Sequence, residues 1–280
     1  MKIISSVSGL RKRLAGETGI AFVPTMGNLH EGHLALLRLA REYGSCVVAS
    51  IFVNPLQFGP DEDFDKYPRT LEDDCARLEG LADVVFTPSI KEMYPEPQTV
   101  FIELPSIAHE LEGAARPGHF RGVATVVLKL LNMVQPNIAL FGKKDYQQLH
   151  IIRCLVAQLD LPIRIIGAET VRAADGLALS SRNQYLSKTE RNEAVLLYQT
   201  LQRISAALLQ GEADMERLQQ QAVEALVAGG WTVDYVAVRN QSDLLPAKPA
   251  KSPKSRHDLV VLAAARLGHT RLLDNVEVSI

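Results

Sequence analysis

Short apolar runs alternate with helix-like patterns through the first 170 residues, and this alternation narrows the folds open to the chain. The runs are rich in β-branched residues, as strands buried in a parallel sheet are. They lie at residues 19–23, 46–53, 83–88, 137–141 and 162–166, and helical patterns cover 34–43, 123–134 and 146–159. The alternation predicts an α/β fold with a Rossmann-like, doubly wound parallel sheet.

The pattern changes in the C-terminal part of the chain. Ser187 and Glu190 have the spacing of a capping box that opens a long helix, which Gly211 ends. Also predicted are a helix over 215–228, strands at 231–238, 259–265 and 270–273, and a solvated connection, rich in Pro, Lys and Ser, over 246–256. We therefore expect a Rossmann-like domain over residues 1–174 and a smaller α+β domain over residues 175–280.

Composition limits the class of protein. The 30 basic and 32 acidic residues give a net charge of −2, so the chain lacks the basic excess that favours nucleic acid as a main partner. Three widely spaced cysteines argue against a disulfide framework and fit a reducing compartment. No secretory h-region or membrane-spanning apolar run is evident, so we expect a cytoplasmic protein with no membrane partner.

The segment PTMGNLHEGH, residues 24–33, lies where the first predicted strand ends and a helix begins. Such a junction presents unpaired backbone N–H groups and the positive end of the helix dipole, which suits a phosphate chain. His30 and His33 can donate hydrogen bonds to phosphate oxygens. Two other interpretations are possible: ordinary polar residues in a first helical turn, or a zinc site. The spacing H-E-G-H differs from the zincin H-E-x-x-H, and Gly32 favours close approach by a ligand or by the sheet.

Three further polar segments carry candidate chemistry. Residues 54–59 and 142–148 each follow a predicted strand, and loops at the carboxyl ends of parallel strands share one edge of the sheet. Lys144 supplies a point charge for phosphate, and Asp145 could accept from a ribose or amino group. Residues 175–183 offer two hydroxyls and an arginine fork. Each segment alone is also typical of a polar loop.

Together these strings resemble the motifs of the pantoate–β-alanine ligase (pantothenate synthetase) family of the nucleotidyltransferase superfamily. The resemblance covers essentially the whole chain and rests on residues 24–33, 52–58, 118–123, 141–149 and 179–186 in the family's order. Residues 175–183 look like the family's version of the K-M-S-K-S loop of class I aminoacyl-tRNA synthetases. Leu179 stands where some members have Met, an apolar exchange that keeps a main-chain contact to adenine.

The resemblance implies a ligase with two half-reactions. A pantoate carboxylate attacks the α-phosphorus of ATP and expels pyrophosphate, and the amine of β-alanine then converts pantoyl adenylate to pantothenate and AMP. It also implies Mg²⁺ bridging the phosphates without a protein metal site, and a homodimer. The first domain would bind ATP and pantoate, and the second would act as a lid.

The site residues implied by the resemblance fall into three groups. The catalytic ones are His30, His33, Lys144 and Arg182, with His33 at the position of the proton donor. The ATP-binding ones are Met26, Gly27, Asn28, Leu29, His30, Glu31, Gly32, His33, Gly142, Lys143, Lys144, Asp145, Val171, Leu179, Ser180, Ser181 and Arg182. Lys143 belongs to this loop without a separate role. Gln57 and Gln148 would hold pantoate, with Gln57 also near β-alanine.

Three alternative functions make predictions that differ from those of the ligase. Another nucleotidyltransferase, transferring AMP or CMP to a phosphate acceptor, would usually be shorter and lack Gln57 and Gln148. A class I aminoacyl-tRNA synthetase needs a tRNA-binding domain, for which 280 residues and a charge of −2 leave little room. A nucleotide-sensing or structural module without catalysis would bind ATP and release no pyrophosphate. The intact residues that argue against it are His30, His33, Lys144 and Arg182.

Overall fold

The computed structural model describes residues 1–60, 62–247 and 257–280, so most of the predicted connection over 246–256 lies outside the described residues. The described chain forms two compact units. The first comprises Met1–His109, Arg116–Lys143 and Gln148–Glu169, and the second comprises Glu110–Ala115, Lys144–Gln147 and Thr170–Ile280. The second unit thus includes two short segments that lie before its main part in the sequence.

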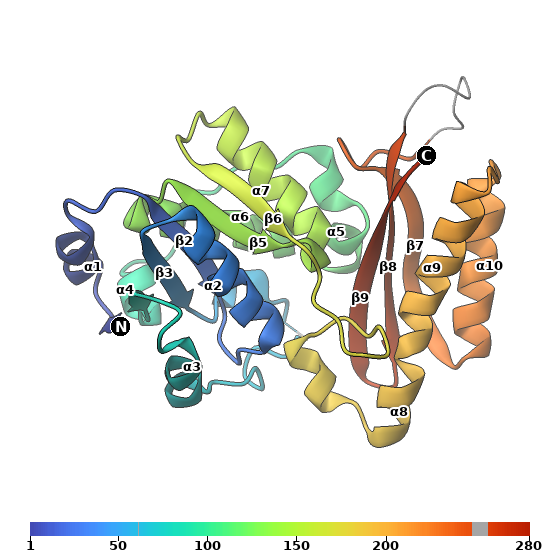
Figure 1. The fold of residues 1–280 in the computed structure, drawn as a ribbon, viewed down its shortest axis with the longest axis horizontal. Helices are drawn as coiled ribbons and strands as arrows, with labels where there is room; N and C mark the ends of the chain where they lie inside the picture. Colours follow the sequence, from blue (N-terminus) through green and yellow to red (C-terminus); the bar gives the residue numbers. More distant parts are fainter. Residues whose placement is uncertain (61, 248–256) are drawn as a thin grey trace. The chain divides into compact units, whose positions relative to one another are not determined.

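The first unit is built on a six-stranded, all-parallel sheet with the order β1-β4-β3-β2-β5-β6. Figure 1 labels β2, β3, β5 and β6 of this sheet. Its strands are β1 (Lys2–Ile4), β2 (Ile20–Thr25), β3 (Cys46–Ile51), β4 (Val84–Phe86), β5 (Ile138–Gly142) and β6 (Arg164–Ala168). The predicted doubly wound α/β sheet is confirmed. The sequence interpretation missed only β1, because this three-residue edge strand is largely exposed and too short to show a period.

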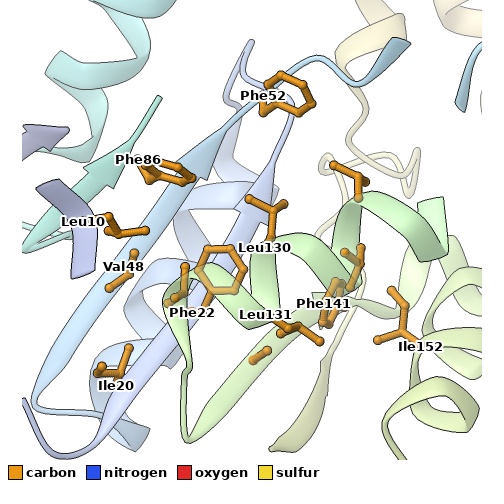
Figure 2. Close-up of a cluster of buried hydrophobic side chains, with 14 of the residues drawn as sticks. Leu10, Ile20, Phe22, Val48, Phe52, Phe86, Leu130, Leu131, Phe141 and Ile152 are labelled. Atoms are coloured by element: carbon orange, nitrogen blue, oxygen red, sulfur yellow. The ribbon is translucent and has the colours of Figure 1, made fainter. Parts of the chain in front are cut away.

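Helices cover both faces of this sheet. They are α1 (Val7–Leu14), α2 (Glu31–Tyr43), α3 (Leu71–Leu78), α4 (Ile90–Met93), α6 (His119–Val134) and α7 (Tyr146–Gln158). Side chains alternate along a strand, so Ile20 and Phe22 of β2 join one buried cluster with residues of α1, α6 and α7 (Figure 2). Ala21 and Val23 join a second cluster with residues of α2 and α3. Because both faces of the sheet are buried by helices, the sheet forms the middle of three layers.

The strand order places a topological switch point beside β2. From β2 the chain passes to β3 and then to β4 in one direction, and β5 returns to pair with the other side of β2. Ligands of open α/β sheets bind beyond the carboxyl ends of the strands at such a point. The loops that follow β2, β3 and β5 therefore share one edge of the first unit.

The second unit has a three-stranded antiparallel sheet, β7-β8-β9, against which α9 and α10 pack (Figure 1). Its elements are α5 (Glu112–Ala115), α8 (Lys188–Glu193), α9 (Val195–Leu209), α10 (Met215–Ala228), β7 (Trp231–Asn240), β8 (Asp258–Leu267) and β9 (Thr270–Ser279). Leu201, Trp231 and Val261 lie in its core. The unit is an α+β structure, as predicted.

Two details differ from the sequence prediction. The Ser187–Glu190 capping box is present, but the helix that it opens ends at Glu193, and α9 starts after Ala194. Strand β9 continues past residue 273 to Ser279, where the alternation is interrupted by Asp274 and Asn275. Both are buried and hydrogen-bonded, which explains why polar residues can occupy these positions.

Among the described residues, no helix combines the length and the apolar character that a membrane span requires.

Candidate active site

The loop from Met26 to His30 joins β2 to α2 and positions both motif histidines. His30 is the N-cap of α2, and its Nδ1 accepts a hydrogen bond from the Gly32 N–H at 3.1 Å. His33 lies one turn into the helix, and its Nδ1 accepts from the His30 N–H at 3.3 Å. The ring centroids are 4.1 Å apart. The two imidazoles are therefore a matched pair, each held by a backbone donor.

These hydrogen bonds define the protonation pattern of the pair. A neutral imidazole that accepts at Nδ1 carries its proton on Nε2. His30 and His33 are thus both Nε2–H donors at the N-terminus of a 13-residue helix, where the helix dipole favours negative charge. This arrangement suits binding of phosphate oxygens.

Asp74, on α3, holds the backbone of the same loop, and the sequence interpretation did not find it. The carboxylate accepts from the Asn28 N–H at 2.9 Å, from the Leu29 N–H at 2.7 Å and from the Thr70 hydroxyl at 3.1 Å. It is 1% exposed. A Cβ on Gly27, whose φ is +81°, would come within 2.9 Å of Asp74 Oδ2. The tight turn of this loop therefore depends on both Gly27 and the buried carboxylate of Asp74.

The loop after β3 meets the loop after β2 through Gln57. Asn54 caps the short 3₁₀ helix η1 (Pro55–Gln57), and its amide Nδ2 donates to Gln57 Oε1 at 3.1 Å. Gln57 is buried, and its Nε2 donates to the Met26 sulfur at 3.1 Å. The structure therefore brings Gln57 together with the histidine loop.

An ion pair supports the backbone of Gln57 from the other side. Arg116 and His119 both hydrogen-bond the Gln57 carbonyl, at 3.3 and 2.9 Å, and Arg116 binds both carboxylate oxygens of Glu62, at 2.8 and 2.5 Å. Burial is the largest single influence and opposes ionisation of Glu62, but the hydrogen bonds and charge of Arg116, together with His119 and the Gly59 backbone, lower the pKa of Glu62 below its ordinary 4.5. The pair therefore stays charged at neutral pH.

This pair gives a pH dependence of stability. Because the pKa of Glu62 is lower in the folded than in the unfolded protein, its contribution is present above the unfolded value, 4.5, and is lost as the pH falls through the folded value. Urea unfolding from about pH 6 to about pH 3 should therefore show a smaller loss of stability for Glu62→Gln than for the wild-type protein. Equal losses in both proteins would contradict the assignment.

The end of β5 supplies Gly142, and Lys143 follows in the 3₁₀ helix η3 (Lys143–Asp145). Lys143 Nζ lies 2.5 Å from Glu169 Oε1, so its charge is already paired. Gln147 is buried and binds the backbone of residues 110 and 112, a structural role in the second unit. Gln148 belongs to the first unit, and its side chain forms no hydrogen bond with the described residues. Of the two adjacent glutamines, Gln147 is thus the one that binds the backbone of the second unit.

The second unit holds the other predicted site residues. The Leu179 N–H donates to the Val171 carbonyl at 3.0 Å, which places these two residues opposite each other in a small loop that turns at Gly176 (φ +97°). Ser180 caps the 3₁₀ helix η4 (Ser181–Tyr185) by accepting from the Arg182 N–H at 3.2 Å. The serine and arginine side chains of this loop are therefore presented from one short, capped turn.

Residues of strand β9 bind both this loop and the backbone of Lys144, all within the second unit. Arg172 forms two hydrogen bonds with the Asp274 carboxylate, at 2.6 and 2.9 Å, and lies 3.8 Å from the centroid of the Tyr198 ring. The Asn275 amide donates to the Lys144 carbonyl at 2.8 Å. The Lys144 ammonium forms neither a hydrogen bond nor an ion pair within the described part of the chain. Its backbone is therefore fixed while its charge is available to a ligand.

The remaining predictions are placed as follows. Glu31, the first residue of α2, is half exposed and forms an ion pair with Arg38, which lowers the pKa of Glu31. Asp145 is exposed. In residues 1–60, 62–247 and 257–280, no group of three or more His, Cys, Asp or Glu side chains could hold a metal ion.

The sequence is similar to one family over nearly its whole length. A family model described as pantoate-beta-alanine ligase matches residues 2–277. A pantothenate synthetase of Methylobacillus flagellatus is 58% identical over 281 residues, covering 100% of this chain and 99% of the relative. One of Nitrosospira multiformis is 56% identical over 280 residues, with the same coverage.

Solved structures show the same likeness. A pantothenate synthetase from Thermus thermophilus superimposes with a TM-score of 0.91 at 44% identity, covering 99% of each chain. A pantoate-beta-alanine ligase from Francisella tularensis, complexed with beta-gamma ATP and beta-alanine, superimposes with a TM-score of 0.79 at 34% identity, covering 99% of this chain and 97% of the other.

Proposed function

This chain belongs to the pantoate–β-alanine ligase family, and we propose that it joins pantoate to β-alanine with ATP, releasing AMP and pyrophosphate. The observation that carries the proposal is the pair of Nε2–H donors, His30 and His33, at the start of α2, in the loop whose Met26 accepts a hydrogen bond from the buried amide of Gln57. Phosphate donors and an amide for a polar acid thus lie on neighbouring loops of one sheet edge.

In the first half-reaction, a pantoate carboxylate oxygen forms a bond to the α-phosphorus of ATP, and the bond to pyrophosphate breaks. The carboxylate is already ionised at neutral pH, so this step needs no general base. Its demands are alignment and stabilisation of developing charge on phosphate oxygens. We assign that stabilisation to the Nε2–H groups of His30 and His33, with His33 as the principal donor.

In the second half-reaction, the β-alanine amine forms the amide bond to the pantoyl carbonyl carbon as the acyl–oxygen bond to AMP breaks. The products are pantothenate and AMP. Gln57 and Gln148 hold the pantoyl group through its oxygens, so both half-reactions share one acid-binding position. Gln57, beside Met26, also serves the amine substrate.

Other residues are assigned to the nucleotide. Cationic and hydroxyl groups that neutralise the triphosphate are Lys144, Ser180, Ser181 and Arg182. The nucleoside is contacted by Asp145, Val171 and Leu179, of which the last two are brought together by a backbone hydrogen bond. The backbone of residues 26–33 and Gly142 would approach the phosphates closely, as the turn at Gly27 permits.

Mg²⁺ fits this site as a partner of the phosphates. Mg²⁺ commonly keeps several waters and binds substrate phosphates without an all-protein cage. When bound, it would shield the charge of the triphosphate. Phosphate oxygens and water would be its main ligands.

We also propose a cytoplasmic homodimer, with an ATP- and pantoate-binding domain over residues 1–174 and a lid over residues 175–280. Cys46, Cys75 and Cys154 are all unpaired thiols, which suits a reducing compartment. Burial raises the pKa of each thiol, so none is an activated nucleophile. Light scattering in solution would test the dimer.

Gln148→Ala is expected to raise the KM for pantoate by about 10-fold and to leave the KM for ATP nearly unchanged, because a hydrogen-bonding amide is lost. Steady-state kinetics with each substrate varied would measure both. Gln158→Ala, at the exposed far end of α7, is the matched control and should behave as wild type. Equal weakening of pantoate and ATP would contradict the pantoate assignment.

The activity itself is tested by product analysis. With ATP, Mg²⁺, pantoate and β-alanine together, the protein should form pantothenate and AMP in equal amounts. Formation of ADP, or of a nucleotide joined to a phosphate acceptor, would contradict the proposed function.

A further inference from the structure

We propose that Tyr94 is a positioning residue for the acid substrate, acting through Asn54 to fix which end of the Gln57 amide faces the ligand. The proposal rests on the proposed function, in which Gln57 binds pantoate. All the residues concerned belong to the first unit.

The chain of hydrogen bonds starts at the Tyr94 hydroxyl, just after α4. It lies 2.8 Å from Asn54 Oδ1, which can only accept, so the phenol is the donor. Burial raises the pKa of Tyr94 well above its ordinary value, so the proton stays on the oxygen over the working pH range. The direction of this first hydrogen bond is therefore fixed.

Only one orientation of the Asn54 amide satisfies its surroundings. Asn54 is 1% exposed, and its Oδ1 accepts from the Leu56 N–H at 3.3 Å as well as from Tyr94. Its Nδ2 donates to the Gly122 carbonyl and to Gln57 Oε1, each at 3.1 Å. A flipped amide would set N–H against N–H at Leu56 and oxygen against oxygen at Gly122, which is costly in a buried site.

The fixed Asn54 amide in turn orients Gln57. Because Gln57 Oε1 accepts from Asn54, its Nε2 is directed the other way, toward the Met26 sulfur at 3.1 Å. A thioether is a weak acceptor, so a substrate oxygen would be a better partner for this N–H group. Gln57 therefore offers a donor, and the site selects an acid that places a hydroxyl or carboxylate oxygen there.

Close packing of α6 against η1 makes the network possible. A Cβ on Gly122 would lie 2.1 Å from the Leu56 carbonyl oxygen and 2.7 Å from Gln57 Cα. Glycine at this position lets the helix backbone come near enough for its carbonyl to bind Asn54. The network is thus supported from α4 on one side and from α6 on the other.

The test is Tyr94→Phe, which removes the hydroxyl and keeps the ring. Pantoate-dependent ATP–pyrophosphate exchange should show a pantoate KM raised about 3–10-fold, the effect of losing one buried hydrogen bond. The ATP KM should stay within about twofold. Tyr43→Phe, on the exposed side of α2, is the matched control and should leave both constants unchanged. Thermal unfolding checks that each variant folds.

A double-mutant cycle separates positioning from a general structural effect. If Tyr94 acts through Gln57, then Tyr94→Phe should add no further rise in pantoate KM to a Gln57→Ala protein. If the fold-changes in pantoate KM of the two single variants multiply in the double variant, the proposal is overturned. It is also overturned if Tyr94→Phe alone leaves the pantoate KM unchanged while the wild-type protein shows normal exchange. A wild-type protein without pantoate-dependent exchange would overturn the proposed function as well.

Discussion

His33→Ala is expected to slow formation of pantoyl adenylate by about 10²–10³-fold, the usual loss for one preorganised donor. The structure gives the reason: His33 accepts the His30 N–H at Nδ1 and so holds its own proton on Nε2, at the start of α2. Single-turnover formation of AMP-bound pantoate, followed by rapid quench, would measure the step. ATP binding should weaken much less than the rate.

Two comparisons sharpen this prediction. His33→Gln keeps an N–H donor near the position of Nε2 and should retain more activity than His33→Ala. His269→Ala removes an exposed imidazole in the second unit and should have no effect. Near-normal turnover by His33→Ala would rule out the assigned role, because that role requires the Nε2–H group of the ring.

Asp74→Asn is expected to reduce kcat/KM for ATP by about 10–100-fold and to destabilise the protein by about 1–3 kcal/mol, because hydrogen bonds to a charged acceptor are strong. The carboxylate accepts from the N–H groups of Asn28 and Leu29, and an amide can accept at only one of its two ends. Its NH₂ group would then face a backbone N–H in a buried site. Exchange kinetics at varied ATP and urea unfolding would measure the two effects.

Asp73→Asn provides the matched control, because Asp73 precedes Asp74 on α3 and is exposed. It should leave both stability and ATP kinetics near wild type. A normal ATP response in Asp74→Asn would mean that the loop after β2 keeps its shape without the carboxylate, and would contradict the account of the loop.

The sequence predicted most of the fold because local pattern determined it. Strands such as β3 are apolar throughout, since both faces of the sheet are covered, and the run is visible without a structure. The short helix α3 was missed because it turns only one narrow face, with Cys75 and Leu78, toward the core. The break between α8 and α9 at Ala194 and the length of β9 depend on tertiary packing. A short stretch of sequence does not show this packing.

Candidate site residues could be chosen from the sequence where they are contiguous in it. His30 and His33 stand in one recognisable segment, whereas Asp74 and Tyr94 act on loops 45 and 40 residues away through buried hydrogen bonds. In sequence, Asp74 is one of three acidic residues in a first helical turn, which ordinarily complements the helix dipole. Only the three-dimensional hydrogen bonds distinguish it from its neighbours.

The most direct test of the central claim is ATP–pyrophosphate exchange with pantoate present and β-alanine absent. The assigned chemistry predicts rapid exchange that requires pantoate, because pantoyl adenylate forms reversibly before the amine takes part. A protein that binds ATP and shows no pantoate-dependent exchange would contradict the claim that this site makes an acyl adenylate.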